Sequence, residues 1–200
     1  PFRALAAAIT PGGEVIAVSN AADETFTVFT IESAEAEIKA VGNVEGKLSD
    51  SVQVTQTDKG WAVLDLSAGT LWLEGKSQAL TLDLDGQALL SAPGGSDLGV
   101  ADTAGLLLVD QSELTSSREV SVPLGSIPVE PQMVDGVLTA AWLAEGDGPG
   151  VLWDSSEGER SLSYGTSSLE AAPAPKIFSN GSQSLLNDVA SGWVWLLPEG

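Results

Sequence analysis

Apolar residues along this chain come in short runs that alternate with polar positions and end at glycine or proline. Thr25–Thr30 alternates threonine with larger apolar residues, and leucine occupies every second position of Ala79–Leu84. A period of two is typical of a β-strand with one buried face. Ser33–Ala40 contains helix-forming residues but is short, and we interpret it as a strand with its approach loop. We expect an all-β chain, with further strands in Glu14–Val18, Ser49–Val54 and Glu119–Leu124, the last with Pro123 at an end or edge.

A longer pattern repeats along the chain: an apolar run, a polar turn and a second apolar run. The clear copies end their first run with Asp65, Asp102 and Asp188, and each has a glycine just before the second run. An aspartate side chain starts a turn by accepting backbone N–H groups, and glycine tolerates positive φ. The clear copies are Trp61–Leu73, Gly99–Val109 and Ser184–Leu196; looser copies are Thr139–Trp153, with Asp147 in its turn, and Pro11–Val18, with Pro11-Gly12-Gly13 as its turn.

Further strand-like runs follow each hairpin. Gln87–Ser91 follows a turn at Asp85-Gly86, and Glu159–Tyr164 and Ser168–Ala172 follow the fourth hairpin. Four antiparallel strands in about 40 residues form the blade of a β-propeller. We therefore predict one propeller-like domain or fragment with blades at 1–45, 46–92, 93–126, 127–172 and 173–200. The third blade is expected to have a loop at Asp110–Arg118 in place of a strand, and the fifth to stop after two strands.

The incomplete fifth blade would leave an open sheet edge, which β proteins avoid. Strands from the two termini could close one blade, blades could be missing, or a second copy of the chain could cover the edge as a homodimer. The chain begins with Pro1, which suggests a mature form or a piece of a longer chain. A β-sandwich, or a pair of small sandwiches, is the alternative fold because strand spacing does not distinguish it.

Composition excludes several function classes. The chain has 28 acidic and 8 basic residues and a net charge of −20, which argues against nucleic acid and against anionic membrane surfaces. Its longest apolar stretch, Gly105–Val109, is far too short to span a membrane. Cysteine and histidine are absent, which removes disulfides, thiolate catalysis and Ser-His-Asp systems. We expect no enzyme, and we assign no catalytic, cofactor-binding or metal-binding residue.

The plentiful carboxylates invite a glycosidase or a calcium site. The recurring aspartates occupy equivalent positions, which favours a turn role over a catalytic pair. Asp83-Leu84-Asp85-Gly86 is similar to the start of a Ca²⁺ loop but lacks the later acidic ligand, so a hairpin with an Asp-Gly turn is favoured. Glu145-Gly146-Asp147 could also hold a cation, although a flexible acidic loop is the simpler interpretation.

The chain contains 6 tryptophans, a number that would suit sugar binding through exposed rings. Trp72, Trp153 and Trp193 or Trp195 fall at matching places in the second hairpin strands, which favours packing between blades. Trp61 and Trp142 lie on first strands and are not assigned. Asn180-Gly181 predicts a tight turn; Asn180-Gly181-Ser182 also matches a glycosylation sequon, to which we give little weight.

Leu185–Leu196, Val63–Trp72 and Val100–Gly105 carry a family resemblance. This repeat resembles segments in the propeller-like N-terminal regions of large actinobacterial envelope proteins that carry fibronectin type III or Ig-like arrays. The resemblance implies a secreted or cell-envelope location and an adhesive or scaffolding role. It supplies no catalytic residues, and the array itself is absent from these 200 residues.

These observations together predict a noncatalytic module that binds an unknown protein or glycan at the cell surface. One alternative is a carbohydrate-binding or carbohydrate-active propeller, supported by the carboxylates and tryptophans. Another is a calcium-stabilised structural domain. Because turns and packing explain the recurring residues, any binding function is expected in the loops between blades.

Overall fold

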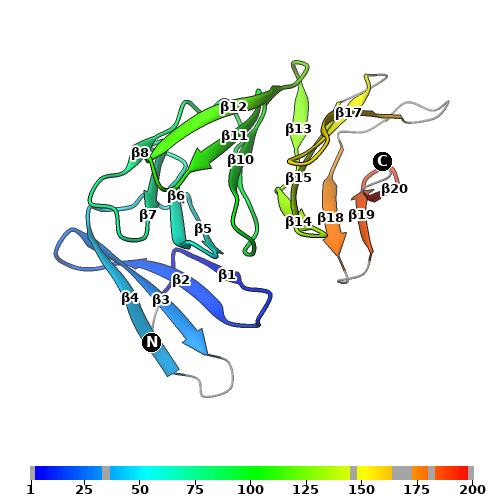
Figure 1. Ribbon diagram of the computed structural model, residues 1–200. Coiled ribbons are helices and arrows are strands. Elements are labelled where there is room, and N and C mark those ends of the chain that lie inside the picture. Colours follow the sequence, from blue (N-terminus) through cyan, green and yellow to red (C-terminus); the bar gives the residue numbers. More distant parts are fainter. Residues whose placement is uncertain (1–2, 33–36, 145–147, 164–172, 180–182, 198–200) are drawn as a thin grey trace. The chain divides into compact units, whose positions relative to one another are not determined.

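The computed structural model describes residues 3–32, 37–144, 148–163, 173–179 and 183–197. In this part of the chain all regular structure is β, in five antiparallel sheets (Figure 1). The all-β prediction is therefore confirmed. None of the described residues belongs to a helix that could cross a membrane.

The chain divides into two compact units, which we describe separately. The first unit comprises residues 1–83, 92–96 and 111–115, and the second comprises 84–91, 97–110 and 116–200. The first unit holds two sheets. The first sheet, in the order β1-β2-β3-β4, is formed by Ala6–Ile9, Val15–Asn20, Thr25–Glu32 and Glu37–Glu45. The second sheet, in the order β5-β6-β7-β8, is formed by Val52–Thr57, Gly60–Asp65, Thr70–Leu73 and Leu80–Thr81.

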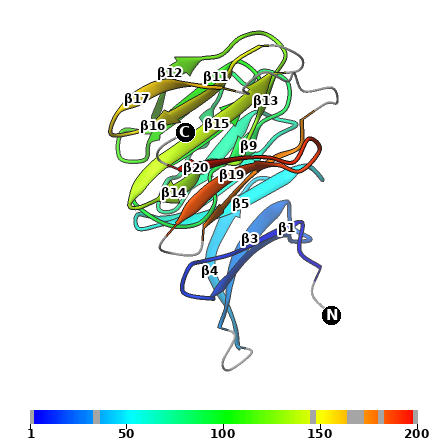
Figure 2. The ribbon, with the colours of Figure 1, turned by 90° about the vertical axis from the view of Figure 1, so that its right-hand side faces the viewer.

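The second unit holds the other sheets, apart from Thr115. The third sheet contains β9 to β12, at Leu89–Leu90, Leu98–Asp102, Gly105–Asp110 and Thr115–Ser121. The fourth contains β13 to β17, at Ser126–Pro128, Gln132–Val134, Val137–Ala144, Gly150–Asp154 and Gly158–Leu162. In it β15 pairs with β13, β14 and β16 (Figure 2). The fifth contains β18 to β20, at Pro175–Ser179, Ser184–Asp188 and Trp193–Leu197.

The sheets differ from the expected blades in four places. Leu89–Leu90 pairs with β10 of the third sheet, although its run was expected in the second blade. β13 begins the fourth sheet at Ser126, the last residue of the expected third blade. β12 occupies Thr115–Arg118, the last four residues of the segment expected to be a loop, and the fifth sheet has three strands where two were expected. The strand expected at Glu119–Leu124 therefore begins earlier, at Thr115, and ends at Ser121. The N-terminal part of β12 was missed because its side chains are mostly exposed and polar. Ser168–Ala172 lies outside the described residues.

Tryptophans fill the contacts between neighbouring sheets. In the first unit, Trp61 and Trp72 pack with Phe26 of the first sheet, and the Phe26 and Trp72 rings meet edge to face at 5.6 Å. In the second unit, Trp142 and Trp153 pack where the third and fourth sheets meet. Trp195 packs between the fourth and fifth sheets. The packing role predicted for the second-strand tryptophans is confirmed, and Trp61 and Trp142 share it.

Candidate functional site

Three buried aspartates recur at one structural position. Asp65, Asp102 and Asp188 end β6, β10 and β19, the second strands of their sheets, and each is at most 3 % exposed. Their carboxylates accept backbone N–H groups two and three residues further on, at 2.8 to 3.2 Å. The donors are Ser67 and Ala68 for Asp65, Ala104 and Gly105 for Asp102, and Ala190 and Ser191 for Asp188. The turn role predicted for them is confirmed.

The same carboxylates also bind the segment that leads into the first strand of their sheet. The backbone N–H of Ser49 donates to Asp65 at 2.7 Å, that of Asp85 to Asp102 at 3.0 Å, and that of Ala174 to Asp188 at 2.7 Å. Each aspartate therefore joins two backbone segments that are 14 to 17 residues apart in sequence. This second role was not predicted, because hydrogen bonds between distant segments leave no local pattern.

Asn20 takes the corresponding place at the end of β2 in the first sheet. Its Nδ2 donates to the Leu48 carbonyl oxygen at 2.8 Å, and its Oδ1 accepts the Leu48 N–H at 3.0 Å. The sequence analysis missed Asn20 because it matched the turn of the N-terminal repeat copy to Pro11-Gly12-Gly13, which precedes β2. Asp147, with Glu145 and Gly146, lies outside the described residues.

Asp102 alone among the three also binds an arginine. Arg118, on β12, donates from Nη1 to Oδ1 at 2.8 Å and from Nη2 to Oδ2 at 2.9 Å. A two-pronged arginine–carboxylate pair holds both groups in one geometry. The Asp102 side chain is fully buried and that of Arg118 is 26 % exposed. The pair links the outer strand β12 to the inner strand β10.

The protonation of these aspartates is unsuited to acid catalysis. Burial alone would raise the pKa of Asp65, Asp102 and Asp188. Their hydrogen bonds outweigh burial, so each pKa lies below the ordinary value of 3.8. Asp154, described below, is shifted in the same direction. A glycosidase general acid needs a raised pKa to keep its proton near neutral pH. These carboxylates are therefore ionised turn acceptors.

We expect the chain to lose stability in acid as these aspartates become protonated. A lowered folded-state pKa means that the unfolded chain binds protons first, so this stabilisation is complete above about pH 4 and disappears as pH falls through the folded-state values. Urea unfolding from neutral pH to about pH 2 measures the loss. Protonation also relieves repulsion within a chain of charge −20. The comparison with Asp188→Asn isolates the contribution of this aspartate. The variant should have a smaller free energy of unfolding at neutral pH and should lose less of it in acid. Equal acid losses in both proteins would contradict this expectation.

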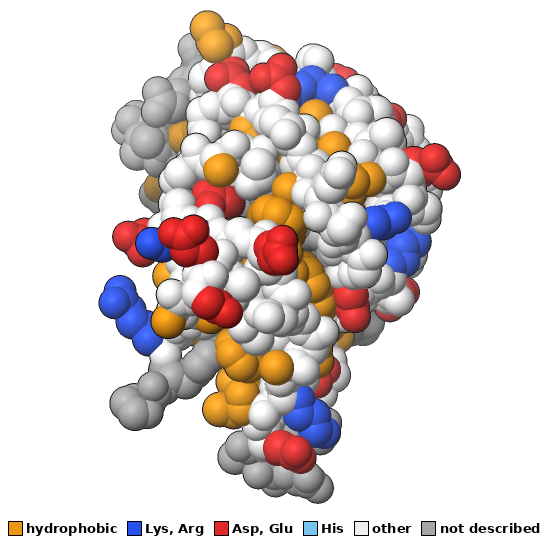
Figure 3. All heavy atoms as spheres, turned by 90° about the vertical axis from the view of Figure 1, so that its left-hand side faces the viewer, with side chains coloured by type: hydrophobic (Ala, Val, Ile, Leu, Met, Phe, Trp, Pro, Cys, Tyr) orange, Lys and Arg blue, Asp and Glu red, His pale blue; other side chains and the backbone are white. Residues whose placement is uncertain are grey.

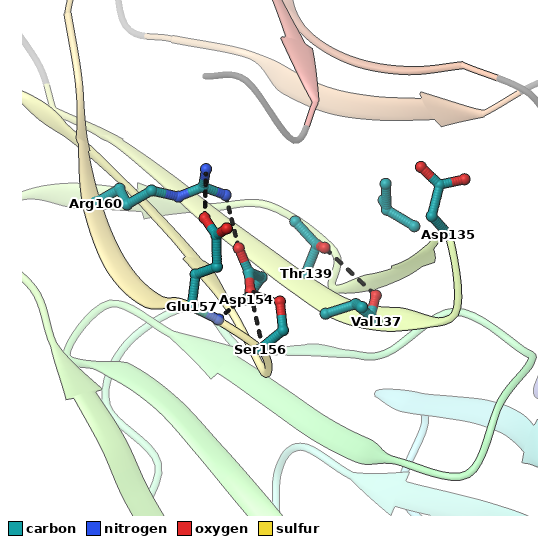
Figure 4. A pocket seen from close by; sticks show the side chains of 8 residues that line it. Asp135, Val137, Thr139, Asp154, Ser156, Glu157 and Arg160 are labelled. Carbon is teal, nitrogen blue, oxygen red and sulfur yellow. Dashed lines mark hydrogen bonds and ion pairs between the residues drawn. The ribbon is translucent and has the colours of Figure 1, made fainter.

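A hollow of about 120 Å³ in the fourth sheet is the candidate binding site among the described residues (Figure 4). It lies between the β14–β15 turn and the β16–β17 turn. Its lining consists of Val134, Asp135, Val137, Thr139, Asp154, Ser156, Glu157 and Arg160. Typical ligand pockets hold about 300–1,000 Å³, so this hollow accommodates only a few atoms.

Most polar groups of the hollow bind one another. Asp154 accepts the N–H groups of Ser156 and Glu157 at 2.9 and 2.7 Å and Nη2 of Arg160 at 2.6 Å. Arg160 Nη1 also pairs with Glu157 Oε2 at 3.2 Å. Asp135 is exposed at the other end of the hollow, in a turn where its φ is +51°. Two carboxylates thus share one arginine, and Asp135 adds a further negative charge. Sequence analysis missed this group because Asp154 ends a third strand, outside the repeated position.

The remaining sequence candidates do not form a cation site. Asp85-Gly86 lies in the connection from β8 of the second sheet to β9 of the third, so the predicted hairpin turn between two strands of one sheet is wrong. Asp85 instead joins two distant segments, because its carbonyl oxygen accepts the N–H and hydroxyl of Thr103. Among the described residues, no group of three or more Asp, Glu, His or Cys could hold a metal ion. Asn180-Gly181-Ser182 lies outside the described residues.

Comparisons with known proteins identify the fold. No protein-family model matches the chain, and no curated protein matches it either. Solved structures do match. Virginiamycin B lyase from Staphylococcus aureus has 13% identity and a TM-score of 0.56, with 96% of this chain and 68% of that chain covered. A protein from Lactobacillus plantarum has 11% identity and a TM-score of 0.55, with coverage of 97% and 70%.

A third structure, dihydro-heme d1 dehydrogenase NirN, has 13% identity and a TM-score of 0.53, with 95% of this chain and 44% of that chain covered. These are propeller-like proteins. The predicted β-propeller-like repeat of antiparallel blades is therefore confirmed, in preference to the β-sandwich. At such low identity the likeness shows the fold and not the activity.

Proposed function

We propose that the chain is a noncatalytic interaction module that binds a protein partner through an apolar sheet face. The single observation behind this proposal is the face of the first sheet that points away from the second, which we name the first-sheet face. Its strands align two apolar rows across the sheet, Ile9-Val15-Ile31-Ile38 and Ala7-Ala17-Phe29-Ala40. Ile9 is 69% exposed and Ile38 is 51% exposed. A large exposed apolar patch marks an interaction site.

The repeated residues support binding over catalysis. The three recurring aspartates serve turns, with lowered pKa values. The tryptophans pack between sheets, which argues against sugar stacking on exposed rings. The alternative is a catalytic propeller. It is favoured by the matched lyase and dehydrogenase, and its residues in this chain would be the carboxylates of the hollow.

The resemblance of the repeat to propeller-like regions of large actinobacterial envelope proteins supports a secreted or cell-envelope location for the module. A calcium-stabilised domain is a weaker alternative, and thermal unfolding with millimolar Ca²⁺ and with EGTA tests it.

Binding of the neutral apolar dye Nile red tests the proposed surface. We expect the folded chain at about 1 µM to raise Nile red fluorescence, and Ile31→Glu to reduce that rise by about half or more because it places a charge within the Ile9-Val15-Ile31-Ile38 row of the first-sheet face. Leu124→Glu is the matched control, because Leu124 is 100% exposed and lies outside the five sheets. An equal effect of both substitutions would refute the assignment of this surface.

Turnover assays separate binding from catalysis. The chain is expected to leave lactone and glycoside substrates unchanged above the uncatalysed rate. Turnover that falls about a hundredfold in Asp135→Asn or Glu157→Gln, with the fold retained by circular dichroism, would replace the interaction proposal with a catalytic one.

A further inference from the structure

The fifth sheet presents a second exposed apolar face. Phe178, Leu185 and Leu196 align in one row across β18, β19 and β20, and Val194 lies on the same side of β20. Phe178 is 49%, Val194 53% and Leu196 56% exposed. The opposite side of the sheet, with Ile177, Leu186 and Trp195, is buried against the fourth sheet. We name the exposed side the fifth-sheet face.

Sheets of this chain bury such faces on one another. Ala140 and Trp142 of β15 pack toward the third sheet, while Ala141 and Leu143 of the same strand pack toward the fifth. The fourth sheet thus uses alternate residues to contact a preceding and a following sheet. In the first unit, Val54 and Val63 of the second sheet likewise pack on Ile16 and Phe26 of the first sheet. The first-sheet face and the fifth-sheet face are apolar in the same way, but their outer strands carry exposed side chains, namely Ile9, Ile38, Phe178 and Leu196.

We propose that a second copy of this chain covers these faces, with the first-sheet face of one copy packed on the fifth-sheet face of another. This inference rests on the proposed interaction function and names its partner. The proposed contact repeats the packing seen inside each unit, where an apolar face of one sheet packs on the apolar face of the next sheet along the chain. Pairing of unlike faces is a heterologous contact, so it can extend to more than two copies.

Charge favours these faces over other contacts between copies. The chain carries −20, so most of its surface repels a second copy. The first-sheet face has one described acidic residue in its paired rows, Glu45, opposite Thr25. The fifth-sheet face carries Lys176, in a row with Asn187 and Val194. Head-to-tail pairing therefore brings two nearly uncharged surfaces together, with one acidic and one basic residue between them.

The size of the faces sets the expected strength. The first-sheet face, with four strands about 4.8 Å apart and about six residues long, spans roughly 400 Å², and the three five-residue strands of the fifth-sheet face span roughly 250 Å². A stable interface buries about 800 Å² on each partner. One contact is therefore expected to be weak, with half-association at tens of micromolar chain. The 200-residue chain should have a mass near 20.5 kDa when dilute and a rising average mass when concentrated.

Sedimentation equilibrium between about 1 and about 300 µM chain tests the inference. Ile31→Glu and Leu196→Glu should each remain at the mass of a single chain, because each blocks one of the two unlike faces. An equimolar mixture should associate again, because each variant retains the face that the other lacks. Leu124→Glu should associate as the unsubstituted chain does. Ile9→Glu, at a more exposed position, replaces Ile31→Glu if the latter does not fold.

Three results would overturn the inference. If the unsubstituted chain stays at single-chain mass at every concentration, the partner is not a second copy. If Ile31→Glu still lowers Nile red fluorescence as expected, the interaction function stands and the partner is a different protein. Leu196→Glu that associates alone would show that first-sheet faces pair with each other. A mixture of the two variants that stays at single-chain mass would exclude pairing of the two unlike faces.

Discussion

Alanine in place of Gly105 is expected to destabilise the chain by several kcal/mol, enough to leave much of it unfolded. Gly105 has a φ of +141°, and a Cβ built there would lie 1.9 Å from the Val120 carbonyl oxygen on β12. The obstacle is backbone of a paired strand, so it cannot rotate away. Overpacking costs about 1–3 kcal/mol and backbone strain about 1–3 kcal/mol more. The total free energy of unfolding of a domain of this size is about 5–15 kcal/mol.

Urea unfolding followed by tryptophan fluorescence measures the effect of Gly105→Ala. Gly158→Ala is the matched control, because Gly158 has a φ of +82° but nothing within 4 Å of a built Cβ. The control carries the backbone strain without the collision and should lose only about 1 kcal/mol. Equal losses of unfolding free energy in the two variants would mean that β12 moves aside. The close approach of β11 and β12 would then not require glycine at position 105.

Alanine in place of Asp102 is expected to cost about 3 kcal/mol. The change removes the acceptor of the Asp85, Ala104 and Gly105 N–H groups and the partner of Arg118. Breaking a buried ion pair costs about 3–5 kcal/mol when the remaining charge stays buried. Arg118 is 26 % exposed, so water partly compensates it and the loss should fall at the lower end. Asp50→Ala, a control at an exposed aspartate, should change stability by about 0.5 kcal/mol or less.

A double-mutant cycle with Arg118→Ala separates the ion pair from the turn. If the pair holds β12 to β10, the two substitutions together should cost at least about 1 kcal/mol less than the sum of their separate costs. Additive losses would assign the whole effect to the backbone N–H groups. Asp102 would then act only as Asp65 and Asp188 do, with Arg118 as an unimportant neighbour.

Local chemistry made much of this fold readable from the sequence. The alternation in Thr25–Thr30 appears in β3, because a strand that buries one face must be apolar at every second position. The turn role of Asp65, Asp102 and Asp188 was also predictable, because the groups they bind lie two and three residues away. The same reasoning placed Trp72 and Trp153 in the packing between sheets.

Other features depend on partners far away in the sequence. The run that contains Leu89–Leu90 has the composition of a strand, but nothing local indicates that it pairs with β10. From the sequence, Arg118 was assigned to a polar loop. In the structure it lies on β12, which pairs with β11, and this position brings its guanidinium group to Asp102. Asp154 and Arg160 were missed because the repeat was sought at the second-strand position alone.

The sequence by itself determined that this chain is a repeat of antiparallel strands joined by Asp- and Gly-based turns, because strand period and turn chemistry act within a few residues. Only the tertiary structure decided which apolar faces are covered. Ile9 and Ile16 both lie in short apolar runs beside the Pro11-Gly12-Gly13 turn, yet Ile16 is 0% exposed under the second sheet and Ile9 is 69% exposed on the first-sheet face. The physical reason is that burial depends on which sheet lies opposite a face, and strand alternation carries no information about that neighbour.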